Sequence, residues 1–545
     1  MAAPGDQGPR GDGGTAPVAS TRAAGGAGAG GAGAGGAGAG ARAAGSALGL
    51  LTLTVLAAAV RLPTLAQQSF WLDEGYTVRL VRMSLGAMLR TIPRTESTPP
   101  AYYVLAWVWT RLFGSGEYGL RSLSALAGVA AVPVVFAAGR RLAGPRAGAV
   151  AGLLVATSPL LVWFSQEARA YALAALLSAI TLLCVIAHRQ DGRSRWLAGW
   201  ALAAGLGLAT HYFVAFVVAP EVALLWWGAH ARPRGGALGP DGRGGRALIV
   251  ATVAVGMVAL ALVPLALAQR GTGHADYIAQ GSVGARLVQV PKQFLVGYAS
   301  PGQTVTAALA ALLVLAGGLW ALIADREARG RARAPLMAGI AAVVAPAVLA
   351  VIGVDFLDTR NVLPALPLLD VALAVGFTAP GAAAGRRAEV SAAALTALAG
   401  LGLVVVGLVV THPRYQRDDW RGAGRELGAA TAPRVILVTP GSGLIPLQAY
   451  LPRLAALATP AAVTEVDVVA IPAQQTGAGI GTPPRPAAPL ALPAGFRLAR
   501  AVDGSTFTVL RYRAPAPVAV TPALTAADHL GPGSAVALVQ RAPGG

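Results

Sequence analysis

Charged residues are scarce in this chain. Asp, Glu, Lys and Arg make up 12% of the 545 residues, whereas hydrophobic residues make up 55% and the mean hydropathy is +0.60. A typical soluble domain is about 25% charged, and a soluble globule cannot bury this much apolar surface. The composition therefore excludes an ordinary soluble protein and predicts an all-α polytopic membrane protein.

Cysteine and lysine are almost absent. Cys184 is the single cysteine and lies in an apolar run, which excludes an intrachain disulfide and a cysteine-based metal site. Lys292 is the single lysine. The sequence also lacks a P-loop, a dinucleotide fingerprint and an H-E-x-x-H motif. It therefore gives no support to ATP-driven transport or metalloproteolysis.

The formal net charge is +19, from 43 basic and 24 acidic residues. The arginines form short clusters between apolar stretches, which is the pattern of cytoplasmic loops in membrane proteins. A continuous basic face, as in a nucleic-acid-binding protein, is not indicated. We therefore expect the lipid bilayer as a partner and no nucleic acid.

The chain begins with a segment that cannot build a core. Residues 1–45 are mostly Gly and Ala and predict a disordered cytoplasmic tail. An uncleaved membrane helix is expected at 46–65. Further apolar runs of about the length that crosses a bilayer lie at 119–139, 147–164, 171–188, 196–211, 213–229, 247–268, 303–324, 336–354, 361–379 and 391–411. The sequence thus predicts roughly eleven transmembrane helices within residues 46–412.

Five arginine-rich loops alternate with five poorer ones. The rich loops contain Arg140, Arg141 and Arg146; Arg189, Arg193 and Arg195; Arg232, Arg234, Arg243 and Arg246; Arg326, Arg329, Arg331 and Arg333; and Arg386 and Arg387. Short cytoplasmic loops are enriched in arginine. We therefore expect the protein in the plasma membrane, with these loops and the N-terminus on the cytoplasmic side. The large first loop, 67–118, is expected outside. Its apolar stretch 102–113 is short for a span and predicts an amphipathic or partly inserted juxtamembrane helix.

The character of the sequence changes after Thr411. Strand-like runs at 435–438, 466–471 and 507–512 and a stretch with helical spacing at 444–457 predict a small external α/β domain over 413–513. The tail 514–545 is rich in Pro and Ala and is expected to be flexible.

The first external loop carries an acidic pair. Asp73 and Glu74 stand beside Phe70, Trp71 and Tyr76 in S-F-W-L-D-E-G-Y. Carboxylates at a membrane surface can activate a hydroxyl as a general base, or hold a divalent cation that does so. The alternative is a solvated helix cap with interfacial aromatic residues.

Two further groups of polar residues are expected on the same side. Glu167, Arg169 and Tyr171 lie at the external end of a span in W-F-S-Q-E-A-R-A-Y, where they can line a polar cavity or mark the headgroup boundary. The other group, which can bind a phosphate or diphosphate, consists of His211 with Tyr212, Lys292, Asp358 and Arg360. Interfacial cations also snorkel to ordinary lipid headgroups.

Four motifs, in order, resemble bacterial members of the protein O-mannosyltransferase and aminoarabinose-transferase superfamily, which are glycosyltransferases with a GT-C fold. They are L-D-E-G-Y; T-P-P-A-Y-Y with L-F-G-S-G-E-Y-G-L-R-S-L-S-A-L; S-P-L-L-V-W-F-S-Q-E-A-R-A-Y-A-L; and T-R-N-V-L-P-A-L-P. Y-Q-R-D-D-W-R-G-A-G-R-E-L is similar to the junction with an extracytoplasmic domain in that superfamily. The chain departs from the family's His-containing segment at Ser97 to Pro100, which bears on the acceptor and on any metal.

The resemblance implies transfer of a mannose-like or other sugar from a polyprenyl phosphate to a glycan, lipid or protein acceptor at the outer face. Asp73 matches the family's catalytic acid, with Glu74 beside it, and Glu167 and Arg169 match a motif that shapes the donor site. Asp73 is then the base of an inverting displacement, and Lys292, Arg360 or Arg169 holds the phosphate. No cofactor is implied with certainty, although a divalent cation fits such a site.

Other readings of the same residues stay open. The aromatic side chains of Trp71, Tyr102 and Tyr103 can pack on a sugar or a prenyl chain, or anchor the interface. A lipid or glycan transporter or flippase is also polytopic, but such folds usually show internal repeats, which this sequence lacks. A scaffold that only anchors the external domain needs no acidic pair.

Overall fold

The computed structural model describes residues 31–230, 243–379, 385–472, 474–475, 479–480, 492–526 and 534–541. The described residues from Gly49 onward form one compact unit. In the unit of residues 1–48, the described part belongs to α1 (Gly31–Arg61). Of the predicted disordered tail, residues 1–30 lie outside the described residues, but residues 31–45 are helical, which corrects the prediction. Alanine is the strongest helix former. The apolar helix that follows is already nucleated, so adding these residues to it does not require a new helix nucleus.

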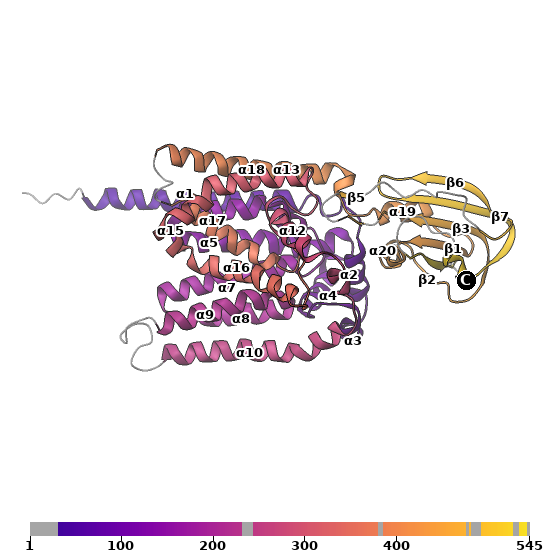
Figure 1. Cartoon of the computed structure of the whole chain (residues 1–545), viewed down its shortest axis with the longest axis horizontal. Coiled ribbons are helices and arrows are strands. Elements are labelled where there is room, and N and C mark those ends of the chain that lie inside the picture. The colour runs from indigo at the N-terminus through magenta and orange to yellow at the C-terminus, as the bar shows by residue number, and fades with distance from the viewer. Residues whose placement is uncertain are drawn as a thin grey trace, which may run out of the picture. The chain divides into compact units, whose positions relative to one another are not determined.

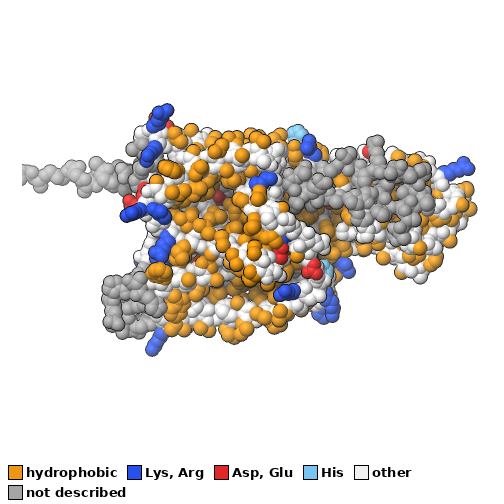
Figure 2. All heavy atoms as spheres, in the orientation of Figure 1, with side chains coloured by type: hydrophobic (Ala, Val, Ile, Leu, Met, Phe, Trp, Pro, Cys, Tyr) orange, Lys and Arg blue, Asp and Glu red, His pale blue; other side chains and the backbone are white. Residues whose placement is uncertain are grey.

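The remaining helices of the bundle follow the predicted order of spans (Figure 1). They are α5 (Glu117–Thr157), α6 (Pro159–Ser165), α7 (Tyr171–Asp191), α8 (Ser194–Thr210), α9 (Ala215–His230), α10 (Arg243–Arg270), α13 (Gln303–Val314), η2 (Leu315–Leu319), α14 (Trp320–Ala324), α15 (Arg326–Arg331), α16 (Arg333–Val351), η3 (Leu363–Ala365), α17 (Leu366–Phe377) and α18 (Arg386–Thr411). The described residues contain 8 helices that are long and apolar enough to cross a membrane. Hydrophobic side chains cover the flanks of these helices (Figure 2).

The helix α5 is two spans joined by a sharp turn. Ala143 and Gly144 leave the helical conformation, and Gly144 has φ +86°, which favours glycine. The two halves then pack closely, because a Cβ on Gly139 would lie 2.7 Å from the carbonyl oxygen of Ala147. With α5 counted twice and the shorter α8 and α17 included, the described part of the chain has the predicted eleven spans.

A buried arginine fixes the end of this hairpin. Arg61 is fully buried, and its guanidinium donates to the carbonyl oxygens of Val155 and Ala156, each at 2.9 Å, and to the hydroxyl of Ser165 at 3.2 Å. The two carbonyls end α5 and lack partners within the helix. A cation at this position also interacts favourably with the helix dipole.

The large first loop folds into three helices, α2 (Leu72–Val81), α3 (Leu85–Thr95) and α4 (Ala101–Phe113). The 13 residues of α4 extend only about 20 Å, so this helix is too short to cross a bilayer and agrees with the prediction for 102–113. Further short helices on the loops are η1 (Tyr212–Val214), α11 (Asp276–Ala279) and α12 (Val283–Val296).

The C-terminal domain is the predicted α/β unit. It contains η5 (Pro413–Tyr415), α19 (Trp420–Leu427), η6 (Gly441–Gly443), α20 (Leu444–Tyr450), η7 (Pro522–Ala526) and the strands β1 (Arg434–Thr439), β2 (Leu454–Ala456), β3 (Ala461–Ala470), β6 (Arg497–Asp503), β7 (Thr508–Val520) and β8 (Val536–Gln540). These strands form one sheet in the order β2-β8-β1-β3-β7-β6, and β4 (Gln474–Gln475) pairs with β5 (Gly479–Ile480) in a second. Only β1 and β3 run parallel within the six-stranded sheet.

Two predicted boundaries in this domain are wrong. The segment predicted as a flexible tail from residue 514 supplies the end of β7 and all of β8, whose Leu538 is fully buried between β1 and β2. That pairing is made with distant segments, so local composition does not reveal it. The helix predicted over 444–457 ends at Tyr450, because Pro452 favours an extended conformation at Leu451.

Candidate active site

The helix α2 carries the acidic pair and is anchored by its second member. Glu74 is fully buried and accepts hydrogen bonds from Arg121 at 2.5 and 2.7 Å and from the backbone N–H of Ala168 at 2.8 Å. The same guanidinium donates to the carbonyl oxygens of Leu65, Gln68 and Ser69. Burial raises the pKa of Glu74, but the charge and hydrogen bonds of Arg121 outweigh it and leave that pKa below its usual value.

Asp73, the first member of the pair, faces a cavity instead. Its Oδ2 accepts a hydrogen bond from Nη1 of Arg360 at 2.7 Å, and its side chain remains 22% exposed. Arg360 lies on the loop between α16 and η3, and its Nε is 3.5 Å from Asp358. Burial raises the pKa of Asp358 to about 6, although its hydrogen bond with the backbone N–H of Arg360 acts in the opposite direction.

A second ion pair lies on the same cavity. Nη1 of Arg169 donates to Oε2 of Glu96 at 2.8 Å, and the hydroxyl of Tyr103 donates to the same oxygen. The hydroxyl of Thr98 lies 3.0 Å from that of Tyr103. The other oxygen of Glu96 has no hydrogen-bond partner among the described residues. Glu96 therefore holds Arg169 while keeping an acceptor available.

A neutral histidine completes this group. Nδ1 of His211 accepts a hydrogen bond from the backbone N–H of Phe213 at 3.3 Å, which assigns the ring proton to Nε2. Burial first, and then the charges of Arg169 and Arg360, lower the pKa of His211 to about 3. Nε2 has no hydrogen-bond partner in the described part of the chain. His211 thus offers a neutral donor.

The cavity has a volume of about 480 Å³. Its polar wall includes Asp73, Glu96, Arg169, Tyr171, His211, Gln269, Arg270, His274, Asp276, Tyr277, Arg360 and Asn361. Its apolar wall includes Leu72, Phe213, Ala266, Leu267, Ile278 and Phe356. A pocket with apolar walls and a few convergent polar groups is the usual form of a small-molecule site.

Comparisons with known proteins match a family model within the helical region and solved structures over most of the chain. Residues 97–235 match the model of the family described as dolichyl-phosphate-mannose-protein mannosyltransferase. The solved structure of ArnT from Cupriavidus metallidurans in the apo state is similar over 85% of this chain and 98% of that chain, with 15% identity and a TM-score of 0.50. No curated protein sequence matches the chain.

The chain has a GT-C fold. This confirms the fold that the resemblance of the four motifs implies. ArnT bound to undecaprenyl phosphate matches with 14% identity and a TM-score of 0.49, over 85% of this chain and 97% of that chain. The oligosaccharyltransferase of Archaeoglobus fulgidus, tethered to an acceptor peptide, matches with 15% identity and a TM-score of 0.41, over 70% and 57%.

Within this GT-C fold, five of the eight predicted site residues meet at the cavity: Asp73, Arg169, Tyr171, His211 and Arg360. Glu74 does not line the cavity, because the backbone turn of α2 directs it to Arg121. It serves as an anchor and is corrected from a catalytic to a structural position. Trp71, Tyr102 and Tyr103 also do not line it, and both tyrosines are fully buried.

Two predictions for the donor site are corrected by the structure. Glu167 is fully buried away from the cavity and pairs with Arg417 at 3.0 Å. Lys292 lies on α12, which the sequence indicated as a loop, and its Nζ is 3.4 Å from the hydroxyl of Thr304. Lys292 is not among the residues that line the cavity.

Sequence reasoning missed Glu96 and Arg270. Glu96 is the single acid in R-T-E-S-T-P-P, and its ion-pair partner Arg169 lies outside the first external loop, so the loop's own sequence gives no signal for this contact. Arg270 ends α10 and lines the cavity without an ion pair to any described residue. Nothing in its sequence context distinguishes it from the arginines of other helix ends.

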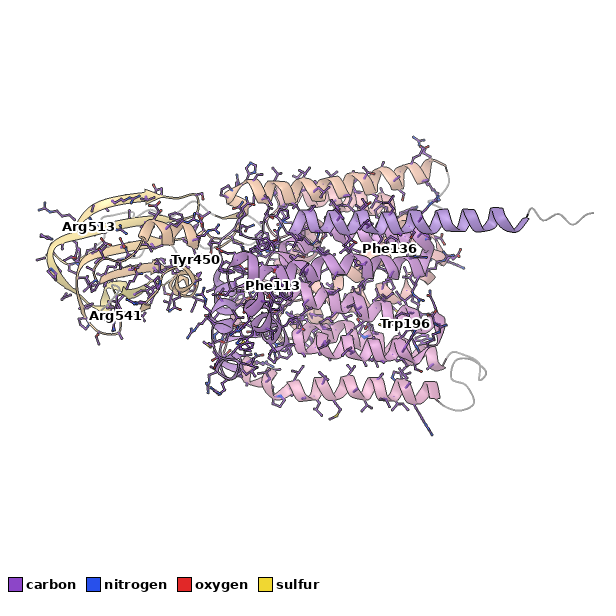
Figure 3. All side chains as sticks on the ribbon, turned by 180° about the vertical axis from the view of Figure 1, so that it is seen from behind. Phe113, Phe136, Trp196, Tyr450, Arg513 and Arg541 are labelled. Atoms are coloured by element: carbon purple, nitrogen blue, oxygen red, sulfur yellow. The ribbon has the colours of Figure 1, made fainter. Side chains whose placement is uncertain are left out.

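The C-terminal domain also contacts the segment that leads into α2. Tyr450, labelled in Figure 3, accepts from the backbone N–H of Phe70 at 2.6 Å and donates to Glu117 at 2.8 Å. Arg417 donates its backbone N–H to the side chain of Gln68 at 2.9 Å. The position of Asp73 therefore depends on residues more than three hundred positions away.

Among the residues that the structure describes, no three His, Cys, Asp or Glu side chains converge to hold a metal ion. Two of the three acids that line the cavity are engaged by guanidinium groups, Asp73 by Arg360 and Glu96 by Arg169. Paired carboxylates of this kind do not fit the oxygen-rich shell that a hard divalent cation needs.

Proposed function

We propose that the protein is a membrane glycosyltransferase that moves a sugar from a polyprenyl phosphate to an acceptor hydroxyl. The observation that carries the proposal is the partly exposed carboxylate of Asp73, held at 2.7 Å from Arg360 inside a cavity of about 480 Å³. An acid that accepts a proton and cations that receive a leaving phosphate are the groups this reaction requires.

In the proposed step, Asp73 accepts the proton of the acceptor hydroxyl. The hydroxyl oxygen forms a bond to the anomeric carbon, while the bond from that carbon to the phosphate oxygen breaks. The phosphate leaves on the prenyl chain with the electron pair, and the single displacement inverts the anomeric centre. Positioning of the two reactants by the cavity lowers the entropic part of the barrier.

The leaving phosphate is proposed to lie against Arg360 and Arg270, with the Nε2–H of His211 as a third donor. A guanidinium binds phosphate through two parallel hydrogen bonds. Arg270 has no carboxylate partner among the described residues, so a phosphate can occupy it without breaking an ion pair. The residues do not fit a divalent cation, and the step is derived without one.

The free oxygen of Glu96 and the amides of Gln269 and Asn361 are suitable for hydroxyl groups of a sugar. The apolar wall around Leu267 and Phe356 fits the first units of a prenyl chain or the apolar face of the sugar. We propose that the acceptor is a glycan, lipid or protein on the extracytoplasmic side of the plasma membrane, the side assigned to the C-terminal domain by the positive-inside rule.

The test is transfer by the full chain in proteoliposomes supplied with polyprenyl phosphates that carry labelled mannose, arabinose or aminoarabinose. The expected product is free polyprenyl phosphate, measured by thin-layer chromatography. Arg360→Gln should raise the donor concentration for half-maximal rate by about ten- to a hundred-fold, from the loss of a charge-assisted hydrogen bond.

The matched control is Arg141→Gln, which also removes an ion-paired arginine, 3.2 Å from Asp191 on a distant rim. It should change the half-maximal concentration less than two-fold. Movement of labelled lipid across the bilayer without release of polyprenyl phosphate would contradict the proposal and favour a flippase.

A further inference from the structure

A second cavity lies at the end of the helical region opposite to α2 and α3, where Figure 1 places α15. Its volume is about 730 Å³, and its walls come from η2, α14, the start of α15 and the start of α18. None of its lining residues belongs to the Asp73 cavity. It is therefore a separate space that the proposed transfer reaction does not use.

Small residues create this space. The lining from η2, α14 and the segment after α17 consists largely of Ala316, Gly317, Ala321, Ala324 and Ala379. Five residues of η2 form a wider π-helical turn, and such turns are frequent at functional sites. Gly317 packs directly against Phe377, since a Cβ at Gly317 would lie 2.2 Å from the ring. η2 and α17 thus lie in close contact on one side of the cavity, and the small alanine side chains leave space on the other side.

The mouth of the cavity is basic. Arg326, Arg386 and Arg387 line it, all three are exposed, and none forms a hydrogen bond or ion pair with a residue in the described ranges. The single acid in the lining is Asp325, whose carboxylate caps α15 by accepting from the backbone N–H groups of Glu327 and Ala328. Three guanidinium groups at one opening favour an anionic ligand.

The apolar surface continues from the cavity onto the outside of the bundle. Trp320 and Val390 line the cavity and are 57% and 46% exposed, and Leu319 and Ile323 of the same helical segment are also exposed. A soluble anion would use only the basic mouth. A ligand with an anionic head and hydrocarbon chains would use the mouth, the alanine wall and this outer surface together.

We propose that this cavity binds the headgroup of an acidic phospholipid from the adjacent leaflet. The phosphate is held by Arg326, Arg386 and Arg387, and an acyl chain lies along Trp320 and Val390. By the positive-inside rule this end faces the cytoplasm, and the cytoplasmic leaflet carries the anionic lipids that basic sites between transmembrane helices recognise. The site is distinct from the one proposed for the polyprenyl donor.

The test is native mass spectrometry of the purified full chain in detergent, titrated with dioleoyl phosphatidylglycerol or with dioleoyl phosphatidylcholine. The expected result is one saturable phosphatidylglycerol, weaker binding of phosphatidylcholine, and no displacement by excess inorganic phosphate. The triple variant Arg326→Gln, Arg386→Gln, Arg387→Gln should lower the affinity for phosphatidylglycerol by about ten-fold or more, because each basic residue near an anionic lipid contributes to the binding energy.

The matched control removes the same charge from the same rim, through Arg140→Gln, Arg146→Gln and Arg329→Gln, which are exposed and do not line the cavity. It should change binding less than two-fold. A second variant, Ala321→Trp, fills the cavity while keeping every arginine and should also weaken binding. Equal losses in both triple variants, or displacement by phosphate, would overturn the proposal in favour of diffuse attraction or a free-phosphate site.

Discussion

Glu167 shows how burial sets the behaviour of a single residue. It lies in the turn between α6 and α7, outside the spans, and burial raises its pKa to about 7, although Arg417 acts in the opposite direction and the charges of Glu74 and Asp73 add to the rise. The raised pKa means that the neutral form is favoured in the folded state. The contribution of Glu167 to the free energy of unfolding is complete below the unfolded pKa of about 4.5, and it is lost as the pH rises through the folded pKa of about 7.

The first prediction concerns Glu167→Gln, which fixes this side chain in a neutral form. The variant and the wild type should have similar unfolding temperatures near pH 4.5, and the variant should be the more stable by up to about 3 kcal/mol at pH 8. Thermal unfolding in detergent across this range measures the difference. A wild type that gains stability over the variant as the pH rises would contradict the assignment.

Lys292 gives the second prediction at this scale. Because Lys292 contacts Thr304 and does not line the cavity, Lys292→Ala should leave the donor dependence of transfer within about two-fold of the wild type, against the much larger loss expected for Arg360→Gln. The comparison uses the same proteoliposome assay. A loss as large as that of the arginine variant would return Lys292 to the donor site.

The site residues also show what the sequence can predict. Asp73 and Glu74 were predicted from the acidic pair of the first external loop. Arg360 was predicted as a cation that can bind a phosphate, and Glu167 as an ionisable residue at the end of a span. The side chains of Glu74 and Glu167 nevertheless point into protein. Whether an acid faces a cavity or a buried arginine depends on helix phase and on distant partners such as Arg417, which no local pattern encodes.

At the scale of elements, α2 is held between the bundle and the C-terminal domain. Gly75 of α2 contacts the backbone of α20, since a Cβ there would lie 3.1 Å from the nitrogen of Pro446. Tyr450 bridges the start of α2 and Glu117 of α5. The C-terminal domain therefore positions the helix that carries Asp73, in addition to any role of its own.

The third prediction follows from this arrangement. Tyr450→Phe removes one hydroxyl that makes two hydrogen bonds, and it should lower the maximal transfer rate several-fold while leaving donor binding almost unchanged, because misplacement of Asp73 affects the chemical step. The control is Tyr415→Phe, whose hydroxyl has no hydrogen bond within the described residues. An equal effect of both variants on rate would contradict a positioning role.

The elements of the bundle were more predictable than their ends. Long apolar runs fixed the eleven spans, because the bilayer demands helices of a certain length. The turn within α5 was predicted from Arg140, Arg141 and Arg146, and it occurs at Gly144. The strand β8 was missed because its hydrogen-bond partners, β1 and β2, lie some eighty residues or more away in the chain.

At the scale of the whole molecule, the arginine clusters predict an orientation in the membrane. The fourth prediction is that single cysteines at Ser194 and Gln280, in a Cys184→Ala background, react with an impermeant thiol reagent from opposite sides of sealed vesicles. Both positions are exposed. Ser194 should label from the cytoplasmic side. Labelling of both from one side would show that the number of spans between α8 and α11 is wrong.

We propose that Asp73 is the base of a sugar transfer and that the cations beside it bind the donor. The most direct test separates the two roles in one variant. Asp73→Asn and the control Asp191→Asn, which also removes a carboxylate that pairs with an arginine, are compared for equilibrium donor binding and for turnover. We predict that Asp73→Asn binds the donor at least as tightly as the wild type but transfers about a hundred- to ten-thousand-fold more slowly, while Asp191→Asn resembles the wild type. Unchanged turnover in Asp73→Asn would contradict the account.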